Sequence, residues 1–496
     1  MKQWLIDLLK QYFFLLFPFI VVFNATLYNS ADSDLGWHLK YGEYFFKHGS
    51  VLRDNIFSTS MISYHWINHS WATDLITYLA FKNFGFLGLT ILGGLIIALT
   101  FYFFSQAAKL SFWGKALVFP VLIYFETPLN IVSFRTQLLS LLGIGILYYL
   151  ISRFEQGERK FLFFTIPLFF VWANIHGGFV LGMLIFFAWI WLYLIQQFFL
   201  IKKTNSSEKV KTVKFLAILF LCGLLVTLIN PFGVGIYSET LHHFDKTWQQ
   251  YIIEWLPFDK FSQLWWQLII WGGFLAAAIT AIFKKKLFRA KFPYIAIALI
   301  FFLLSFWMRR YAWPMYYLSI PVLQPLTELV GFKNSKLNIL VSSTILILFY
   351  SLITFAKNPR EQFLAMNWNR YCRQYVSCSA KAAEYIINHR LTDRLLTFYN
   401  WGGWLIWNYP QIKPSIDGRM PAWIDDRGYS AFVDYYAYEQ NWQDIDNSGF
   451  DVVFMTPKKM LYNRLLELVK EDKWQLVYKD AYSGVFVRKN APKLQK

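Results

Sequence analysis

The sequence predicts an α-helical polytopic membrane protein with about eleven spans and a small α/β domain at its C-terminal end. Two observations predict the spans. Of 496 residues, 56% are hydrophobic and only 16% are charged, with a mean hydropathy of +0.35, and long apolar runs alternate with short polar linkers. A third observation predicts the domain, because the apolar runs stop near residue 355 and short strand and helix patterns follow. This composition is not that of a soluble enzyme.

The apolar runs have the composition of membrane-spanning helices, which need about 20 apolar residues. The first run is interpreted as a retained anchor, because it lacks the small-residue cleavage site of a removed signal peptide. A weaker run at 71–84 contains Asp74 and Lys82. The stronger runs lie near 11–28, 86–107, 116–127, 136–152, 161–175, 178–200, 214–230, 264–283, 292–308, 312–330 and 337–355.

The net charge of +18 resides mostly in short linkers between the runs, where basic residues are topology signals and not nucleic-acid contacts. Successive basic linkers are separated by two runs, so all of them can lie in the cytoplasm together. This orientation predicts a multi-pass protein of the plasma (inner) membrane with a cytoplasmic N-terminus and an extracytoplasmic C-terminal domain. The basic linkers are 153–160, 202–214, 284–291 and 333–336.

These two end positions require an odd number of membrane crossings. The runs 71–84 and 116–127 therefore do not both cross, and one of them is re-entrant or interfacial. The sequence does not distinguish between the two.

The expected domain boundaries follow from this topology. We expect a transmembrane bundle over 1–355, with external loops at 29–70 and 231–263, and an extracytoplasmic α/β domain over 356–496. In this domain, two cysteines at 372 and 378 flank a polar segment, and they either pair, if the segment is extracytoplasmic, or remain two thiols. The predicted elements are strands at 395–399 and 451–455, a strand that leads into a turn over 413–419, helices from 402 and over 458–471, and a hairpin over 474–488.

The first external loop contains the most informative motif, Asp32-Ser-Asp34-Leu-Gly-Trp-His38. Carboxylates at the mouth of a membrane span are costly to hold near lipid. This cost favours a functional role over a solvated loop, which is the alternative for an isolated Asp-x-Asp. Apolar residues then alternate with charges as far as Gly49. The pattern predicts an amphipathic helix in the membrane interface that ends at Gly49.

Further polar groups fall on the same predicted external side. His176 stands in a turn before a glycine pair, Glu254 lies in the long loop, and Arg309 and Arg310 separate two spans. Arg135 joins them if the run before it crosses the membrane. Arginines outside, against the positive-inside rule, need an anionic partner. That partner is either a phosphate, which fits the guanidinium fork, or a lipid headgroup.

A metal site is the weaker interpretation of these polar groups. His65 and His69 have the i, i+4 spacing of a metal pair on a helix, but no cluster of carboxylates or cysteines accompanies them. No clear second Asp-x-Asp occurs in the later external loops. No cofactor is therefore predicted with certainty, and a divalent metal stays open.

The order of these motifs resembles the C-type glycosyltransferase superfamily (GT-C), integral membrane enzymes that use polyprenyl-phosphate-linked sugars. The resemblance implies a polyprenyl-phosphate-linked sugar donor, contacts with membrane lipids, and a lipid, glycan or protein acceptor in the cell envelope. It also implies that an acidic residue of the first external loop, Asp32 or Asp34, serves at the active site. The motifs that carry it are Asp32-Ser-Asp34-Leu-Gly-Trp-His38, Arg53-Asp-Asn-Ile-Phe-Ser58, Trp66…His69-Ser-Trp71, Trp172-Ala-Asn-Ile-His176, Asn230-Pro-Phe-Gly, Glu254-Trp255, and Gly402-Gly-Trp404 with Asp417-Gly-Arg419.

The chemistry of such a transfer assigns roles to these residues. A carboxylate deprotonates the acceptor hydroxyl, and cationic groups stabilise the departing phosphate. We expect Asp32 or Asp34 to be the base, and the arginines, with His176, to face the phosphate. The residues expected to bind substrate are His38, Arg135, His176, Glu254, Arg309 and Arg310.

Two other classes of protein compete with this interpretation. A lipid or polysaccharide transporter should carry ionisable residues near the middle of several spans and often has internal repeats, which these nearly charge-free runs do not show. A non-catalytic membrane scaffold with an external binding domain would not require carboxylates and arginines on one membrane face.

Overall fold

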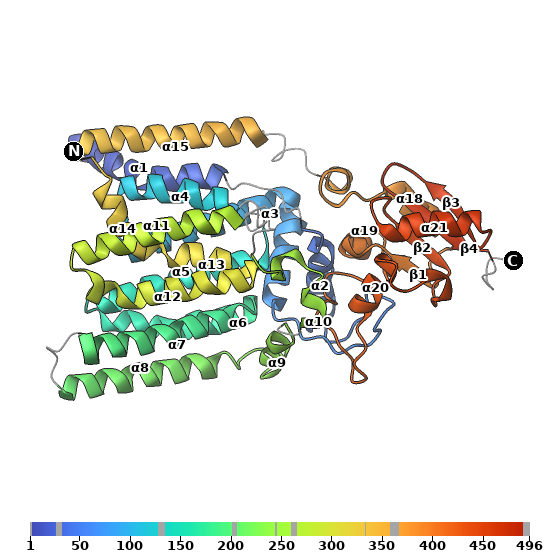
Figure 1. Ribbon diagram of the computed structural model, residues 1–496, viewed down its shortest axis with the longest axis horizontal. Coiled ribbons are helices and arrows are strands. Elements are labelled where there is room, and N and C mark those ends of the chain that lie inside the picture. Colours follow the sequence, from blue (N-terminus) through green and yellow to red (C-terminus); the bar gives the residue numbers. More distant parts are fainter. Residues whose placement is uncertain are drawn as a thin grey trace. The chain divides into compact units, whose positions relative to one another are not determined.

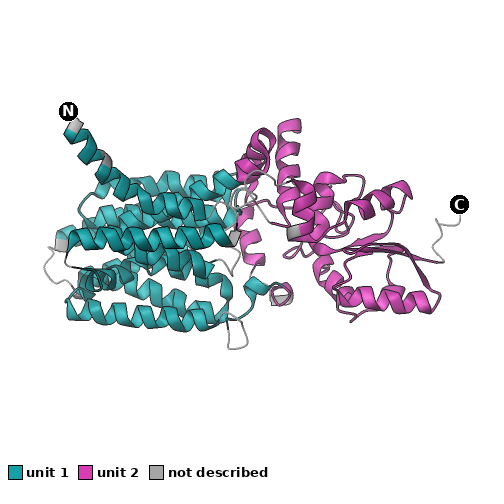
Figure 2. Cartoon of the chain, turned by 90° about the horizontal axis from the view of Figure 1, so that it is seen from above, with its two compact units in different colours: residues 1–29, 90–234, 252–364 teal, residues 30–89, 235–251, 365–496 magenta. Residues whose placement is uncertain are grey.

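The chain forms two compact units, each assembled from separate stretches of sequence (Figure 2). Unit 1 comprises Met1–Asn29, Thr90–Val234 and Ile252–Leu364, and unit 2 comprises Ser30–Leu89, Gly235–Tyr251 and Ala365–Lys496. The computed structural model describes residues 2–25, 32–126, 134–200, 206–243, 246–258, 265–332, 334–357 and 367–489.

Unit 1 is a bundle of helices (Figure 1). Within it, α5 packs against α6 and α7, α12 packs against α7 and α13, and α4 packs against α1 and α15. The α-helices are α1 Lys2–Ala25, α3 Trp71–Ala108 (of which residues from Thr90 belong to unit 1), α4 Phe112–Glu126, α5 Thr136–Glu155, α6 Thr165–Ile175, α7 Phe179–Ile195, α8 Ser206–Val226, α11 Trp265–Lys284, α12 Phe288–Trp307, α13 Ala312–Leu318, α14 Ile320–Leu329 and α15 Ser335–Lys357. Short 3-10 or π-helices lie at η2 Arg159–Phe164, η3 Gln196–Leu200, η4 Ile253–Trp255 and η5 Arg309–Tyr311.

Among the described residues, seven helices are long and apolar enough to cross a membrane. They support the prediction of an integral, multi-pass membrane protein. The remaining predicted runs also fall in helices, namely α4, α6, α8, and α13 with α14, so the total of about eleven spans stays a prediction. The seven are Gln3–Ala25, Trp71–Ala108, Thr136–Glu155, Phe179–Phe199, Trp265–Lys284, Phe288–Trp307 and Ser335–Phe355.

The two runs at 71–84 and 86–107 form one helix, α3, that breaks at Gly85. Gly85 has φ 59° and ψ −149°, a conformation that side chains with a Cβ rarely adopt, so glycine permits the break. The run at 116–127 lies in α4, whose 15 residues span roughly 22 Å. Which of the two segments crosses the membrane stays a prediction.

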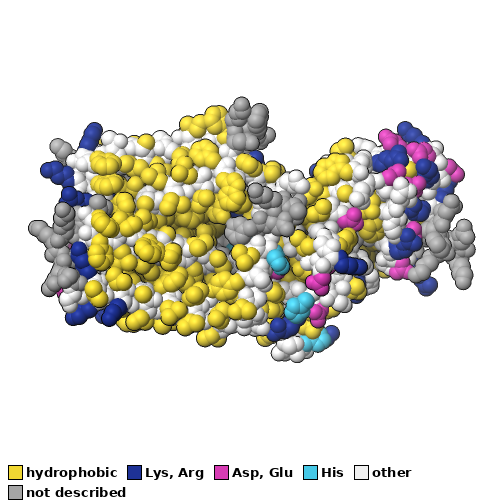
Figure 3. All heavy atoms as spheres, turned by 60° about the horizontal axis from the view of Figure 1, so that its bottom comes forward, with side chains coloured by type: hydrophobic (Ala, Val, Ile, Leu, Met, Phe, Trp, Pro, Cys, Tyr) yellow, Lys and Arg dark blue, Asp and Glu magenta, His cyan; other side chains and the backbone are white. Residues whose placement is uncertain are grey.

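The surface of unit 1 has the pattern of a membrane bundle. Large apolar side chains such as Leu303 (68% exposed), Leu352 (69%) and Phe355 (91%) lie on its outside. Figure 3 shows a broad hydrophobic surface with Lys and Arg side chains gathered at one end of the bundle. The prediction that the basic linkers share one side requires this arrangement, since exposed apolar surface of such extent marks contact with lipid.

Unit 2 combines α2 with a four-stranded sheet and its helices. Gly49 ends α2 in the left-handed conformation (φ 69°), as predicted, while the apolar face of α2 is buried, largely against α19. The placement of α2 in the membrane interface stays a prediction. The bounds are α2 Leu35–His48, α9 Gly235–His242, α10 Lys246–Gln249, α17 Trp368–Tyr371, η6 Cys372–Val376, α18 Ala380–Asn388, β1 Leu395–Thr397, η7 Tyr399–Trp401, α19 Gly402–Asn408, α20 Ala431–Glu439, η8 Ile445–Asn447, β2 Val452–Met455, α21 Met460–Lys470, β3 Trp474–Lys479 and β4 Gly484–Arg488.

The sheet has the strand order β1-β2-β4-β3. β1 and β2 are parallel, with Leu396 opposite Val453, and β3 and β4 form the predicted terminal hairpin. The strand predicted at the start of 413–419 is wrong, because residues 413–417 are irregular, while the predicted turn follows at Gly418 and Arg419. The backbone of the irregular segment bonds elsewhere: Pro414 O accepts from Thr59 N at 2.9 Å instead of from a neighbouring strand, and proline has no N–H to donate to a ladder.

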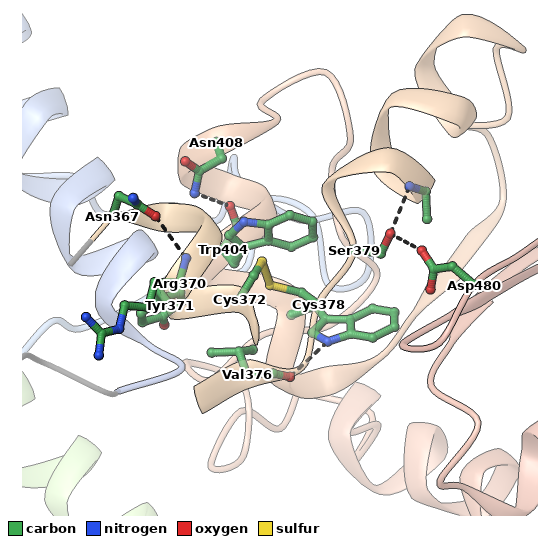
Figure 4. The surroundings of a disulfide bond; sticks show 12 residues. Asn367, Arg370, Tyr371, Cys372, Val376, Cys378, Ser379, Trp404, Asn408 and Asp480 are labelled. Carbon is green, nitrogen blue, oxygen red and sulfur yellow. Dashed lines mark hydrogen bonds between the residues drawn. A yellow bond between two sulfur atoms is a disulfide. The ribbon is translucent and has the colours of Figure 1, made fainter. Parts of the chain in front are cut away.

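A disulfide joins Cys372 to Cys378 (Figure 4), which settles the alternative that the sequence left open. The loop that it closes packs on the start of α19, where Trp401 Nε1 donates a hydrogen bond to Val376 O at 3.2 Å. Both cysteines are buried, and so is Tyr371 directly before the loop. The disulfide therefore fixes a segment inside the core of unit 2.

Candidate functional site

The Asp32–Asp34 segment forms a tight turn that starts α2. Asp32 Oδ1 accepts a hydrogen bond from Asp34 N at 3.1 Å, a turn that aspartate side chains favour. Asp34 O then accepts from Trp37 N at 3.1 Å, so Asp34 stands at the N-terminus of α2 without capping it through its side chain. A helix N-terminus stabilises a carboxylate through its dipole. Asp32 is 8% exposed, while Asp34 is half-buried.

His38, one turn further along α2, pairs with Asp74 at the start of α3. Its Nδ1 lies 2.5 Å from Asp74 Oδ1. Asn68 Nδ2 donates to the other oxygen of Asp74 at 2.6 Å, and the ring of Trp37 stacks on the imidazole at 3.6 Å. Because a carboxylate only accepts, Nδ1 carries the proton and Nε2 is the atom left for a ligand.

The charges around His38 explain its titration. Burial alone would lower the pKa of His38, but the carboxylates of Asp74, Asp32 and Asp34 together raise it above its usual value. Three carboxylates therefore raise the pKa of one imidazole. We call these four residues the acidic cluster: Asp32, Asp34, His38 and Asp74.

Asp74 and Asn68 were not among the site residues predicted from the sequence. The sequence does indicate that Asp74 has a buried partner, because it lies inside an apolar run, where an unpaired charge is costly. Periodicity does not reveal that the partner is His38, because the pairing joins two separate helices.

A second pair of charges in unit 2 is fully buried. Arg419 Nε and Nη2 bond Asp417 at 2.8 Å each, and Arg419 Nη2 also bonds Asn55 at 3.0 Å and Ser58 at 2.8 Å. Burial alone would raise the pKa of Asp417, but Arg419 and Ser58 hold it below its usual value. The guanidinium also lies 5.0 to 5.2 Å from ring centroids, those of Phe57, Trp66 and Trp423.

A further buried carboxylate of unit 2 is Glu239 on α9. Burial raises its pKa to about 7, and His242 Nδ1 lies 4.0 Å from its carboxylate. Sequence reasoning did not single it out, because α9 is a short helix within a polar loop.

Unit 1 brings three of the predicted substrate-binding residues together. Arg135 Nη1 lies 3.4 Å from Glu254 Oε1, and Arg310 Nη1 lies 3.7 Å from Glu254 Oε2. The guanidinium of Arg310 also sits over the ring of Trp255 at 4.8 Å. We call Arg135, Glu254 and Arg310 the arginine cluster. Its two cations share one carboxylate, which leaves a net positive charge for an anion.

The arginine cluster lies at the end of the bundle opposite two of the basic linkers. Arg135 directly precedes α5 and the linker 153–160 follows it, while α12 follows the linker 284–291 and ends before Arg310. Each helix has 20 residues, or about 30 Å, which is the thickness of the hydrocarbon core.

Arg309 and His176 have different surroundings from the other predicted residues of unit 1. Arg309 Nε donates to Pro257 O at 3.0 Å. His176 Nδ1 lies 2.6 Å from Ser140 Oγ and accepts from Gly178 N at 3.1 Å, while Trp172 Nε1 donates to the same Ser140 oxygen at 2.9 Å. Nδ1 of His176 is thus an acceptor, which leaves a proton on Nε2.

Within the described ranges, no three His, Cys, Asp or Glu side chains are placed to hold a metal ion. His65 and His69 lie in a loop and not on a helix. His65 Nδ1 is 3.2 Å from Asp54, and the ring of His69 contacts His243 instead. The helical geometry required for an i, i+4 metal pair is therefore not formed.

No family model and no curated protein matches the chain. A solved structure does: the crystal structure of ArnT from Cupriavidus metallidurans bound to undecaprenyl phosphate matches with a TM-score of 0.51 and 12% sequence identity, covering 100% of this chain and 99% of that chain.

At this sequence identity the likeness is one of fold. It extends over the membrane helices and the C-terminal sheet alike, because the whole chain is covered. The chain therefore has the fold of the ArnT structure over its whole length.

Proposed function

We propose that this protein is a membrane glycosyltransferase that transfers a sugar from a polyprenyl-phosphate donor to an acceptor hydroxyl on the extracytoplasmic face. The full-length fold match carries the proposal, since the matched ArnT structure is bound to undecaprenyl phosphate. The presence of an acidic cluster and an arginine cluster supports it, because the reaction needs a base and a phosphate partner.

The proposed step is a direct displacement. The acceptor oxygen attacks the anomeric carbon while the bond from this carbon to the phosphate oxygen breaks, and its electron pair leaves with the polyprenyl phosphate. The acceptor proton passes to a carboxylate. The donor needs no further activation, because a phosphate is already a good leaving group.

Asp34 is the better candidate for the base. Asp32 uses Oδ1 to accept the backbone N–H of Asp34 and is almost fully buried, so its carboxylate shapes the turn. Asp34 is half-buried at the N-terminus of α2. His38, with its Nδ1 held by Asp74, presents Nε2 as a substrate-binding group.

The arginine cluster is the proposed phosphate site. Arg135 and Arg310 supply guanidinium forks that match phosphate oxygens, and Arg309 and the Nε2–H of His176 are further donors of unit 1. The described residues do not fit a divalent cation site, and the proposed step uses protein side chains alone. Glu254 forms ion pairs with both arginines, and the phosphate of the donor takes its place when the donor binds.

The test is turnover by the purified protein in detergent. With a labelled polyprenyl-phosphate pentose or hexose and an envelope extract as acceptor, wild-type protein should release polyprenyl phosphate. The double variant Asp32→Ala/Asp34→Ala should release none while keeping its gel-filtration profile. Retained turnover in this variant contradicts the base assignment, and a lack of wild-type turnover with every donor tested contradicts the proposed function.

A further inference from the structure

We propose that the glycines of the Gly402-Gly403 and Asp417-Gly418-Arg419 motifs position the Asp32–Asp34 turn, and that Gly418 sets the place of the Asp34 carboxylate. The proposal rests on the proposed function, because a displaced carboxylate alters turnover only if Asp34 is the base. It makes the C-terminal segment of unit 2 a part of the catalytic apparatus instead of an accessory domain.

The glycines are packed too closely against the turn to accept a Cβ atom. A Cβ built on Gly418 would overlap Asp34 Oδ1, and a Cβ on Gly403 would overlap Ser33 O. A Cβ on Gly36, the second residue of α2, would overlap Gly403 O in turn. None of these glycines has a positive φ. They are needed for the close approach of two chain segments and not for an unusual backbone conformation.

The two glycine motifs that contact the turn are themselves held in place. A Cβ on Gly402 would lie 2.6 Å from Ile416 O, so the two glycine motifs also pack on each other. Arg419 ties its motif to Asn55 and Ser58 of the first loop through fully buried hydrogen bonds. The hydrogen bonds of Arg419 thus hold Gly418, the neighbouring residue, in its place against the turn.

A further contact holds the opposite end of the turn. The hydroxyl of Tyr371 donates a hydrogen bond to Asp32 O. Tyr371 is fully buried directly before the disulfide-closed loop (Figure 4). Backbone and side-chain contacts from three parts of the C-terminal segment therefore converge on three consecutive residues.

Gly418 differs from Gly403 in what a methyl group would displace. At Gly403 and Gly36 the obstacle is backbone, so alanine must move the chain. At Gly418 the obstacle is the end of the Asp34 side chain, which can rotate. Gly418→Ala should therefore move the carboxylate and leave the fold nearly unchanged, which identifies Gly418 as a positioning residue.

The experiment compares Gly418→Ala with Gly449→Ala in the full-length protein. Gly449 lies in the same unit, and a Cβ there meets no atom within 4 Å. Release of polyprenyl phosphate is measured from pH 5 to 9 (about 0.5-unit steps) together with thermal unfolding in detergent. We expect Gly418→Ala to lower kcat by about 10- to 100-fold, to leave the KM for the donor unchanged and to shift the acidic limb of the pH profile.

Two results overturn the proposal. One is wild-type kcat in Gly418→Ala, and the other is an equal loss at every pH with an unmoved acidic limb. Asp34→Asn is assayed in parallel to separate the hypotheses. If Asp34→Asn is inactive but Gly418→Ala is fully active, only the positioning role fails. If Asp34→Asn is fully active, the base assignment fails and the positioning role fails with it.

A second measurement covers loss of folding. If Gly418→Ala lowers the unfolding midpoint, we expect the overlap of the new methyl group with the Asp34 side chain to be the cause. A shorter side chain at position 34 should then remove the overlap. Asp34→Ser/Gly418→Ala should then unfold at the midpoint of Asp34→Ser alone, a coupling that a double-mutant cycle detects. A double variant as unstable as the sum of both changes overturns the proposal.

Discussion

The acidic cluster of unit 2 and the arginine cluster of unit 1 are built in opposite ways. In the acidic cluster, Asp74 is fully buried and its two oxygens bond His38 and Asn68 at 2.5 and 2.6 Å. In the arginine cluster, the side chains are 22% to 36% exposed, and Glu254 meets Arg135 and Arg310 at 3.4 and 3.7 Å.

The difference corresponds to two tasks. Short hydrogen bonds in a packed environment hold a reacting group where it is needed and require no reorganisation during the reaction. Partly exposed ion pairs at longer distances contribute little to the free energy of folding. An incoming anion can therefore replace the carboxylate of Glu254 easily. We therefore expect substitutions in the acidic cluster to change kcat and those in the arginine cluster to change KM.

The largest effect is expected from Asp34→Asn. Removal of a general base costs about 10²- to 10⁴-fold in rate, so kcat should fall by this factor while the KM for the donor stays within about twofold. The measurement is steady-state release of labelled polyprenyl phosphate.

Asp32→Asn is the matched control for this substitution. Its amide oxygen can still accept the backbone N–H of Asp34, so the turn is kept and kcat should fall by less than about tenfold. Equal losses in the two variants would contradict the division of roles between these aspartates.

Much of this arrangement was predictable from the sequence, because it depends on local patterns. Apolar runs are independent of tertiary contacts, and the structure places helices over all of them within the described ranges. The left-handed Gly49 that ends α2 is local in the same way. The sequence also indicated that Glu254 and Arg310, with Arg135 if the run before it crosses, lie on one predicted side, and the structure brings these three side chains within ion-pair distance.

The contacts that build the acidic cluster were not predictable from these patterns. Asp74 and Gly418 each act on residues more than 30 positions away, and neither periodicity nor charge counting reports such a pairing. The segment 413–419 shows the same limit. We predicted a strand at its start, but the buried bonds of Asp417 and Arg419 to the first loop determine an irregular path.

The second largest effect is expected on stability, from Arg419→Gln. Arg419 and Asp417 are completely buried, and the loss of one partner of a buried pair costs about 3–5 kcal/mol because the other charge stays behind. The unfolding midpoint in detergent should drop accordingly. Arg427→Gln serves as the control: Arg427 pairs with Asp425 but is 86% exposed, and its loss should leave the midpoint nearly unchanged.

The same pair gives stability a defined pH dependence. The pKa of Asp417 is lower in the folded chain than its usual 3.8, so the folded state binds fewer protons there than the unfolded state does. The stabilisation is present above pH 3.8 and disappears as the pH falls through the lowered value. Arg419→Gln should lose this acid-dependent part, and an unchanged acid transition would contradict the assignment.

An intermediate effect is expected in the arginine cluster. Arg310→Gln removes a charge-assisted contact worth about 1.5–3 kcal/mol, so kcat/KM should fall about 10- to 100-fold, mainly through KM. Glu254→Gln should act in the opposite direction and lower the KM for the donor by at most about fivefold, because a competing carboxylate is removed.

Glu328→Gln is the matched control for Glu254→Gln. Glu328 pairs with Lys285 at the same 3.4 Å and with similar exposure, yet it lies next to a basic linker and should leave KM unchanged. An increase in KM for Glu254→Gln would show that Glu254 contacts the substrate itself instead of competing with it.

The smallest effect is expected from His38→Gln and concerns the alkaline side. The pKa of His38 is raised in the folded chain, so the folded state keeps its proton to higher pH than the unfolded state does. The resulting stabilisation is complete below pH 6.5 and is lost as the pH rises through the raised value.

His38→Gln should therefore flatten part of the fall in unfolding midpoint that the wild-type protein shows as the pH rises above 6.5. Glu239, whose pKa of about 7 gives a fall of the same sign, contributes to the part that remains. His48→Gln, at the exposed end of the same helix, should leave the profile unchanged. If His38→Gln has the wild-type profile, the three surrounding carboxylates do not hold a proton on His38, and the electrostatic account of the acidic cluster is wrong.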